Sequence, residues 1–484
     1  MNRSVVRDPI RILASREFVL LRAGVVAGLL LLGMVTGMLI ARGHLAPMLL
    51  LGGAVGAMGL VVWRRVGRFE HGIVAIALAA GLLNFFTLPT GTESRIVISL
   101  LIAVALTGLW LLEMLVTTKR IALEPSPINK PLLAFVVVNV VAYLWSTLLR
   151  DPLVFVPSFF PLVQGAALLV NILLPLLALL VSNKIKEVAW LQRLAWIMVG
   201  LGVFKLVSIQ FNLPTEAMID NGSRGVFVTW VGAMVYSQAL FNEKLSLWKR
   251  LLLLALLAAW VYWYFIKYVL WFSGWVPLMV ACALITLMRS KKLFVAVALI
   301  ALVYVGINFN FYSQKLYEAK VAQGDLQRLD LWQMNLEHVI QHPLFGMGPA
   351  GYTVYNMTYH PEDARSTHNN YFDVLAQTGV VGLIAFIWMF IVFIRVGIRS
   401  FRALARRRDF EAAFASATLA GCIGALVSMM LGDWVLPFAY NQTIAGFDNA
   451  AYTWIFLGAM VSLYQMIKAR SDMRIGTMEE ASHA

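Results

Sequence analysis

The sequence predicts an all-α protein: a polytopic membrane helix bundle of about 14 transmembrane helices with one partly helical loop module outside the cytoplasm. Three observations predict this class. Hydrophobic residues make up 60% of the 484 residues, and charged residues make up only 13%, whereas a soluble domain carries about 25% charged residues. The mean hydropathy is +0.78. Apolar runs of about 20 residues, the length that crosses a bilayer, recur along the chain.

These apolar runs define the expected membrane helices in chain order. Eleven of them follow one another closely up to residue 309, and three more begin at residue 370. Their approximate bounds are 19–41, 45–63, 71–88, 96–116, 132–148, 161–182, 188–210, 225–241, 250–266, 270–288, 293–309, 370–394, 411–432 and 449–467.

The excess of basic residues, which gives a formal net charge of +14, predicts topology rather than nucleic-acid binding. Cytoplasmic loops of membrane proteins collect Lys and Arg. With this span order, both termini fall on the side whose segments hold about three quarters of the 39 basic residues. We therefore expect cytoplasmic termini and a large outer loop at 310–369. The chain then divides into transmembrane helices 1–11 (1–309), the loop module (310–369), and helices 12–14 with a cytoplasmic tail (370–484).

The loop module carries the polar residues that a membrane bundle otherwise lacks. Leu329, Trp332, Leu336 and Ile340 recur at helical spacing and predict an amphipathic helix. Pro343 follows this stripe, and Gly346 and Gly348 punctuate the turn after it, so the helix should end there. A folded polar module at the rim of a membrane bundle is where we expect chemistry.

His368 is the candidate catalytic residue of this module. It stands at the entry to the span that begins at residue 370. A histidine at a membrane–water boundary can accept a proton near neutral pH, which is the role of a general base. The alternative is a plain helix-entry residue, with Asn369 and Asn370 serving as helix caps.

Basic residues on the outer side form a second group of candidates. Arg224 precedes the span at 225–241, Arg328 opens the amphipathic helix, and Lys267 lies at the outer end of the span at 250–266. Guanidinium groups suit bidentate contact with phosphate oxygens, so a diphosphate would give these cations a common partner. The alternative is ordinary snorkelling of long side chains to the interface, which we favour for Lys205 and Arg150.

The sequence predicts neither a metal nor a cofactor. His338 and His342 are four residues apart on the expected helix, a spacing that can bind a metal. The sequence has no His-Glu-x-x-His pattern, and both cysteines, Cys282 and Cys422, fall inside expected spans. The metal signal is therefore weak.

The motifs in the second half of the chain resemble those of the bacterial O-antigen ligase and O-antigen polymerase superfamily. The matching residues are Arg328-Leu-Asp-Leu-Trp332, His342-Pro343-Leu-Phe-Gly346-Met-Gly348, His368-Asn369-Asn-Tyr371 and Gly379-Val-Val-Gly382. The resemblance is specific over about 55 residues and looser elsewhere. Many members also have Ser-Arg-Gly in the span pair before the loop, where this chain reads Trp271-Phe-Ser273-Gly274-Trp275.

The resemblance implies a metal-independent, inverting glycosyltransferase of the bacterial inner membrane with its loop module in the periplasm. Such an enzyme moves a glycan from an undecaprenyl-diphosphate carrier to an acceptor hydroxyl. By this resemblance His368 is the base, Arg224 and Arg328 hold the diphosphate, and Lys267 stands in for the missing family arginine. Trp332, Asn369, Gly346 and Gly348 support the site. The expected partners are this lipid-linked donor, an acceptor that is a glycan or lipid A core, and membrane lipids.

Three other functions remain open from the sequence. A chain polymerase of the same superfamily shares the site and differs in acceptor, as does an oligosaccharyltransferase acting on protein. A flippase or transporter for lipid-linked glycans is the rival from another class. It needs intramembrane charges along a path, for which Lys205 is the main candidate.

Overall fold

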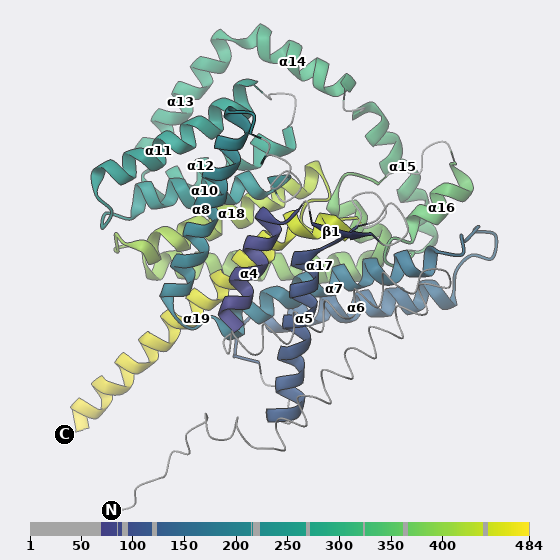
Figure 1. Cartoon of the computed structure of the whole chain (residues 1–484), viewed down its shortest axis with the longest axis horizontal. Helices are drawn as coiled ribbons and strands as arrows, with labels where there is room; N and C mark the ends of the chain where they lie inside the picture. Colours follow the sequence, from purple (N-terminus) through teal and green to yellow (C-terminus); the bar gives the residue numbers. More distant parts are fainter. Residues whose placement is uncertain are drawn as a thin grey trace, which may run out of the picture.

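The computed structural model describes residues 69–84, 86–89, 95–118, 123–213, 215, 223–267, 272–322, 325–361, 366–438 and 444–483. These residues form a helical bundle (Figure 1). Within these ranges, two short antiparallel strands, β1 (Thr87–Pro89) and β2 (Arg95–Val97), form a small sheet.

The helices follow one another with short connections. In chain order they are α4 (Phe69–Leu82), α5 (Ile98–Leu112), the π-helix η1 (Glu113–Thr118), α6 (Asn129–Leu148), α7 (Phe160–Lys184), α8 (Val188–Gln210), α10 (Phe227–Phe241), α11 (Leu247–Val261), the π-helix η3 (Tyr262–Lys267), α12 (Phe272–Arg289), α13 (Lys291–Ile307), α14 (Phe309–Ala322), α15 (Asp325–Gln341), α16 (Tyr352–Tyr359), α17 (Asn370–Ala403), α18 (Phe410–Leu431), the 3-10 turn η4 (Ile444–Gly446) and α19 (Phe447–His483).

The helices confirm an all-α polytopic membrane protein. In the described part of the chain, 9 helices are long and apolar enough to cross a membrane, and α13 with the start of α14 makes a tenth if that pair, bent by 79°, is one span. The expected spans at 71–88 and 225–241 are shorter apolar helices, α4 and α10. The first was placed too far along the chain, because residues 87–89 form β1 instead. The spans at 19–41 and 45–63 lie outside the described residues, so the count of fourteen stays a prediction.

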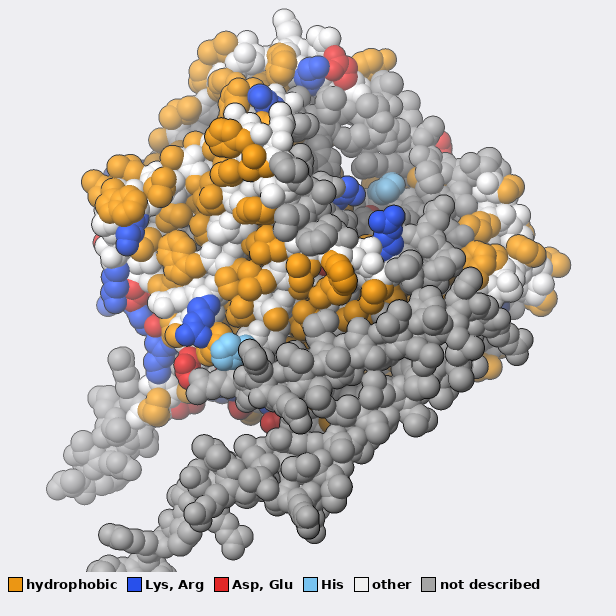
Figure 2. Space-filling view, in the orientation of Figure 1, with side chains coloured by type: hydrophobic (Ala, Val, Ile, Leu, Met, Phe, Trp, Pro, Cys, Tyr) orange, Lys and Arg blue, Asp and Glu red, His pale blue; other side chains and the backbone are white. Residues whose placement is uncertain are grey.

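Burial divides the helices into inner and outer ones. α18 and α19 are the central helices, because 72% and 78% of the residues in their most apolar stretches are buried. In α6 and α11 the corresponding fractions are only 33% and 28%. On α13 no residue is buried, and Figure 1 shows α13 and α14 arching away from the bundle. On the described part of the face in Figure 2, hydrophobic side chains far outnumber charged ones, as expected for a surface in lipid.

Ion pairs join several of the expected cytoplasmic segments at one end of the bundle. Glu243, after α10, lies 3.1 Å from Arg289 at the end of α12 and 3.7 Å from Arg408 after α17. Glu411 in the first turn of α18 contacts Arg407 at 3.0 Å and Arg470 of α19 at 2.8 Å. Segments that the charge pattern assigns to one side of the membrane therefore meet in space.

The loop module packs on the bundle through its own small apolar core. The predicted amphipathic helix is α15, which ends at Gln341, just before Pro343, as expected. The stretch after the glycine turn, which the sequence left unassigned, forms α16. The buried side chains of this second core are Val154, Phe160, Ala167, Val339, Met347, Ala350, Tyr352, Val354, Tyr355, Ala376 and Phe438. They come from the module, from α7 and the loop before it, from α17 and from the loop after α18, so the module is fixed to the bundle.

Candidate active site

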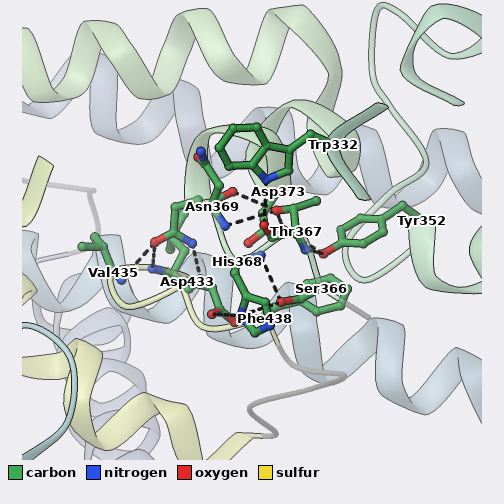
Figure 3. Close-up of polar contacts among 12 residues, drawn as sticks. Trp332, Tyr352, Ser366, Thr367, His368, Asn369, Asp373, Asp433, Val435 and Phe438 are labelled. Atoms are coloured by element: carbon green, nitrogen blue, oxygen red, sulfur yellow. Dashed lines mark hydrogen bonds and ion pairs between the residues drawn. The ribbon is translucent and has the colours of Figure 1, made fainter. Parts of the chain in front are cut away.

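His368 lies directly before α17, at the junction of the module and the bundle (Figure 3). Its ring Nδ1 is 3.8 Å from a carboxylate oxygen of Asp433 and 3.4 Å from the hydroxyl of Ser366. The His368 side chain is 41% exposed, whereas that of Asp433 is 1% exposed. Nδ1 thus faces this buried carboxylate, and a proton on Nδ1 would leave the lone pair of Nε2 to a substrate.

The loop that carries Asp433 is held in place by Asn370, the first residue of α17. The Asn370 side-chain oxygen accepts from the backbone N–H of Val435 at 3.0 Å, and its amide donates to the Leu436 carbonyl at 2.7 Å. Asn369 caps α17, since its side-chain oxygen accepts from the Tyr371 N–H at 3.0 Å. The capping role read from the sequence thus describes Asn369, while Asn370 joins two distant segments.

A second buried carboxylate lies one turn into α17. One oxygen of Asp373 accepts from the hydroxyls of Tyr352 at 2.7 Å and Thr367 at 2.6 Å. Tyr352 also stacks on Phe438 with ring centroids 4.5 Å apart, and the Phe438 N–H donates to Asp433 at 3.2 Å. Burial and the nearby Asp373 carboxylate raise the pKa of Tyr352 well above its usual value, so this phenol remains a hydrogen-bond donor.

The glycine turn of the module docks into a break in α17. Gly379 has φ +65 and ψ −170, which interrupts the helix. The Val380 N–H donates to the Pro343 carbonyl at 2.8 Å, and the N–H groups of Met347 and Gly348 donate to the carbonyls of Ala376 and Gln377 at 2.9 Å. Backbone groups freed by a broken membrane helix need such partners. The turn therefore completes the backbone hydrogen bonding of the span that His368 precedes.

The glycines of this junction are required by space and by backbone conformation. A Cβ atom on Gly379 would lie 2.2 Å from the Leu344 carbonyl oxygen, and one on Gly346 (φ +64) would lie 2.5 Å from that of Ala376. Gly348 (φ +81) similarly leaves no room beside Ser146. L-residues rarely adopt these positive φ values.

The structure places the three candidate phosphate ligands in different settings. Arg224 is exposed, and the backbone of the next residue, Gly225, lies against the ring of Trp434, so the Arg224 turn packs on the same loop as Asp433. Arg328 lies in the first turn of α15, and its side chain is outside the described part of the molecule. Lys267 ends η3, with its ammonium group 4.9 Å from the Trp263 ring centroid. Phosphate binding by these residues stays a prediction.

Figure 2 shows a hollow beneath the arch of α13 and α14, with basic and histidine side chains at its inner edge.

Trp332, expected to support the site, donates its indole N–H to the Thr367 carbonyl at 2.9 Å and stacks on Phe372. α15 is thereby joined to the segment just before His368.

Sequence reasoning missed Asp433, Asp373, Tyr352 and Thr367. The available signal was an acidic residue at the end of an apolar run, because charges near membrane depth are costly and tend to be functional. Asp433 follows the span at 411–432, and Asp373 lies at the start of the span at 370–394.

His338 lies in the last turn of α15 and His342 just after that helix. Among the described residues, no group of three or more His, Cys, Asp or Glu side chains is arranged to hold a metal ion. His338 is buried against the rings of Tyr355, Tyr359 and His360. Burial lowers the pKa of both His338 and His342.

Comparison with known proteins gives one family match. Residues 272–387 match the O-antigen ligase family. The resemblance predicted from the motifs is thereby confirmed over this segment, about a quarter of the chain, which runs from α12 into α17 and contains His368. No curated protein matches the chain.

The family match indicates an O-antigen ligase-like protein with glycosyltransferase-type activity in a multi-pass membrane setting. The matched O-antigen ligase segment includes Arg328, Trp332, Gly346 and Asn369. Arg224 and Lys267 precede it, and Asp433 follows it at the end of a separate helix.

Proposed function

We propose that this protein transfers a glycan from an undecaprenyl-diphosphate carrier to an acceptor hydroxyl on the periplasmic side of the bacterial inner membrane. The reaction is that of an inverting, metal-independent glycosyltransferase in cell-surface polysaccharide synthesis. The observation that carries the proposal is the pairing of exposed His368 with buried Asp433, with His368 just before α17 and inside the segment that matches the O-antigen ligase family.

The chemistry follows from these groups. Nε2 of His368 takes the proton of the acceptor hydroxyl while the oxygen of that hydroxyl attacks the anomeric carbon of the donor sugar. The bond from that carbon to the carrier phosphate breaks, and the diphosphate departs with the electron pair. Asp433 stabilises the imidazolium that forms. Attack opposite the leaving group inverts the anomeric centre.

Fixed cations stabilise the negative charge of the departing diphosphate. Arg224 and Arg328 take this role, and Lys267 supplies the third contact. The lipid tail of the donor requires access from the bilayer. The hollow beneath the α13–α14 arch (Figure 2) would supply this access, because it lies beside α13, a helix that buries none of its residues.

The acceptor is lipid A core if the enzyme is a ligase. The first experiment is the glycan phenotype of a deletion strain, with carrier-linked and surface pools analysed separately. We expect long chains to accumulate on the carrier. A surface acceptor capped by a single repeat unit would instead indicate a polymerase, and unchanged pools would contradict the proposal in favour of a transporter.

Complementation of that strain tests the residue assignment. The His368→Ala variant should reach the membrane in normal amount and fail to restore the surface glycan, with transfer reduced by about 10²–10⁴-fold. Transfer by the wild-type protein in membranes should persist after treatment with a chelator. Full activity of His368→Ala would remove His368 from the mechanism, and loss of activity with the chelator would contradict metal independence.

A further inference from the structure

His368 has an unusual backbone conformation for a functional residue. Its φ is +49, in the left-handed region that residues with a side chain seldom occupy. Such a conformation persists only where the surrounding structure fixes it. The structure around His368 therefore contains the groups that hold it there.

These groups act through the preceding residue, Thr367, to which they are hydrogen-bonded (Figure 3). The Thr367 hydroxyl donates to Asp373 at 2.6 Å, and its carbonyl accepts from the Trp332 indole at 2.9 Å. Its N–H donates to the Tyr352 hydroxyl at 3.4 Å. Thr367, Tyr352 and Asp373 are almost completely buried. Because all polar atoms of Thr367 are hydrogen-bonded, its position is fixed. The change in chain direction before α17 therefore occurs at His368, which adopts the positive φ.

The same residues fix the partner of the His368 ring. Tyr352 donates to Asp373 at 2.7 Å and stacks on Phe438, and the Phe438 N–H holds the Asp433 carboxylate. The backbone of His368 and the carboxylate that faces its ring thus depend on one set of contacts.

We propose that Thr367, Tyr352 and Asp373 form a positioning clamp that imposes the left-handed conformation of His368 and so directs its Nδ1 at Asp433. These are positioning residues, because they act through His368 and not on the substrate. The consequence for catalysis rests on the proposed function, whereas the conformational statement does not. Asp373 acts in the clamp as a hydrogen-bond acceptor, so its oxygen is needed and its charge is not.

The first test measures conformation without any transfer reaction. Glycine tolerates positive φ and alanine does not, so purified His368→Gly should melt about 1–2 °C above His368→Ala. Both variants are then combined with Tyr352→Phe, which removes the hydroxyl and keeps the ring that stacks on Phe438. With the clamp cut, His368 relaxes and the difference should disappear. No difference with the clamp intact, or the same difference with it cut, would overturn the proposal.

The second test measures positioning in the transfer reaction. Thr367→Val should lower kcat about tenfold or more while the KM for the lipid-linked donor stays within twofold, and Thr367→Ser should restore kcat because it keeps the hydroxyl. Asp373→Asn should retain most of the activity that Asp373→Ala loses. Thr147→Val is the matched control, since the Thr147 hydroxyl is exposed and bonds only within its own helix.

The two tests separate failure of the clamp from failure of the proposed function. If His368→Ala transfers glycan as well as the wild type, the proposed function is wrong, and the melting comparison still decides whether the clamp exists. If His368→Ala is inactive while Thr367→Val and Asp373→Ala are fully active, the clamp has no part in catalysis.

Discussion

The ring nitrogen of His368 that faces Asp433 is the detail on which the proposed chemistry depends. A neutral imidazole has one N–H and one lone pair, and the group beside Nδ1 decides which nitrogen carries the proton. A carboxylate there favours the N–H on Nδ1 and leaves Nε2 as the base.

Replacement of Asp433 should therefore slow glycan transfer without weakening the binding of the donor. We expect Asp433→Asn to lower kcat by about 10²-fold, with little change in the KM for the donor. The measurement is transfer to acceptor in purified membranes, with Asp472→Asn as the control, since Asp472 is an exposed acid on α19. Equal rates for the two variants would show that His368 works without its carboxylate.

The sequence locates the base and not its surroundings. His368 and Asn369 belong to a contiguous motif, so a single stretch of sequence identifies them. Asp433 lies at the end of another helix, 65 residues after His368. The hydrogen bond between Asn370 and Val435 joins the two segments. Asp433 could have been noticed as an acid at the end of an apolar run, but tertiary contacts between distant segments carry no local pattern, so neither its pairing with His368 nor the hydrogen bonds to Thr367 could be predicted from sequence.

Among the helices, the break in α17 depends on Gly379, which has a positive φ and no room for a side chain. Gly379→Ala places a methyl group against backbone atoms of the turn at a positive φ. We expect it to destabilise the protein by at least about 2 kcal/mol and to lower its melting temperature in detergent. Gly200→Ala is the matched control, because a Cβ on Gly200, in the membrane helix α8, meets nothing within 4 Å. Similar melting of the two variants would contradict the required break.

His338 in α15 and His342 just after it should make the stability of the module depend on pH. Burial and the neighbouring His360 lower the pKa of His338 below its ordinary value of 6.5, and burial lowers that of His342. Glu337 and Asp151 act in the opposite direction on His338 and His342 respectively, but do not outweigh burial. Below about pH 6.5 the unfolded chain binds protons that the folded chain does not, so stability falls as the pH falls.

The matching experiment compares thermal unfolding at pH 7.5 and pH 5.5. Between pH 7.5 and pH 5.5, the melting temperature of the wild type should fall by roughly 1–3 °C more than that of His338→Gln. Because each protein is compared with itself, the packing lost in the variant does not enter. Parallel behaviour of the two proteins would show that the buried histidine does not set the pH dependence.

For the whole molecule, composition and hydropathy were enough to predict the class. Length and apolarity locate membrane helices because every span must bury its backbone polar groups. They fail where an apolar stretch is not a full helix, as at 71–88, where the chain turns into β1. They also give no information on burial, so α13 and the central α18 read alike in sequence and differ completely in their surroundings.

Orientation in the membrane is a property of the whole chain that labelling can test. After replacement of Cys282 and Cys422 by alanine, a cysteine at exposed Ser313 in α14 should react with an impermeant maleimide in cells with a permeable outer membrane. A cysteine at exposed Ser471 in α19 should react only after the inner membrane is opened. The reverse pattern would contradict the periplasmic position of the module.

The docking of the glycine turn into α17 also has a consequence for how the protein is made. Residues 343–348 leave the ribosome before residues 376–381, so the turn is synthesised before its partners in the span exist. The span in turn cannot satisfy its backbone at Gly379 until the turn returns to it. Biogenesis must therefore bring the loop module and a later membrane segment together before the span is complete. A defect in either should first be seen as a protein removed by quality control, and only afterwards as a slow enzyme.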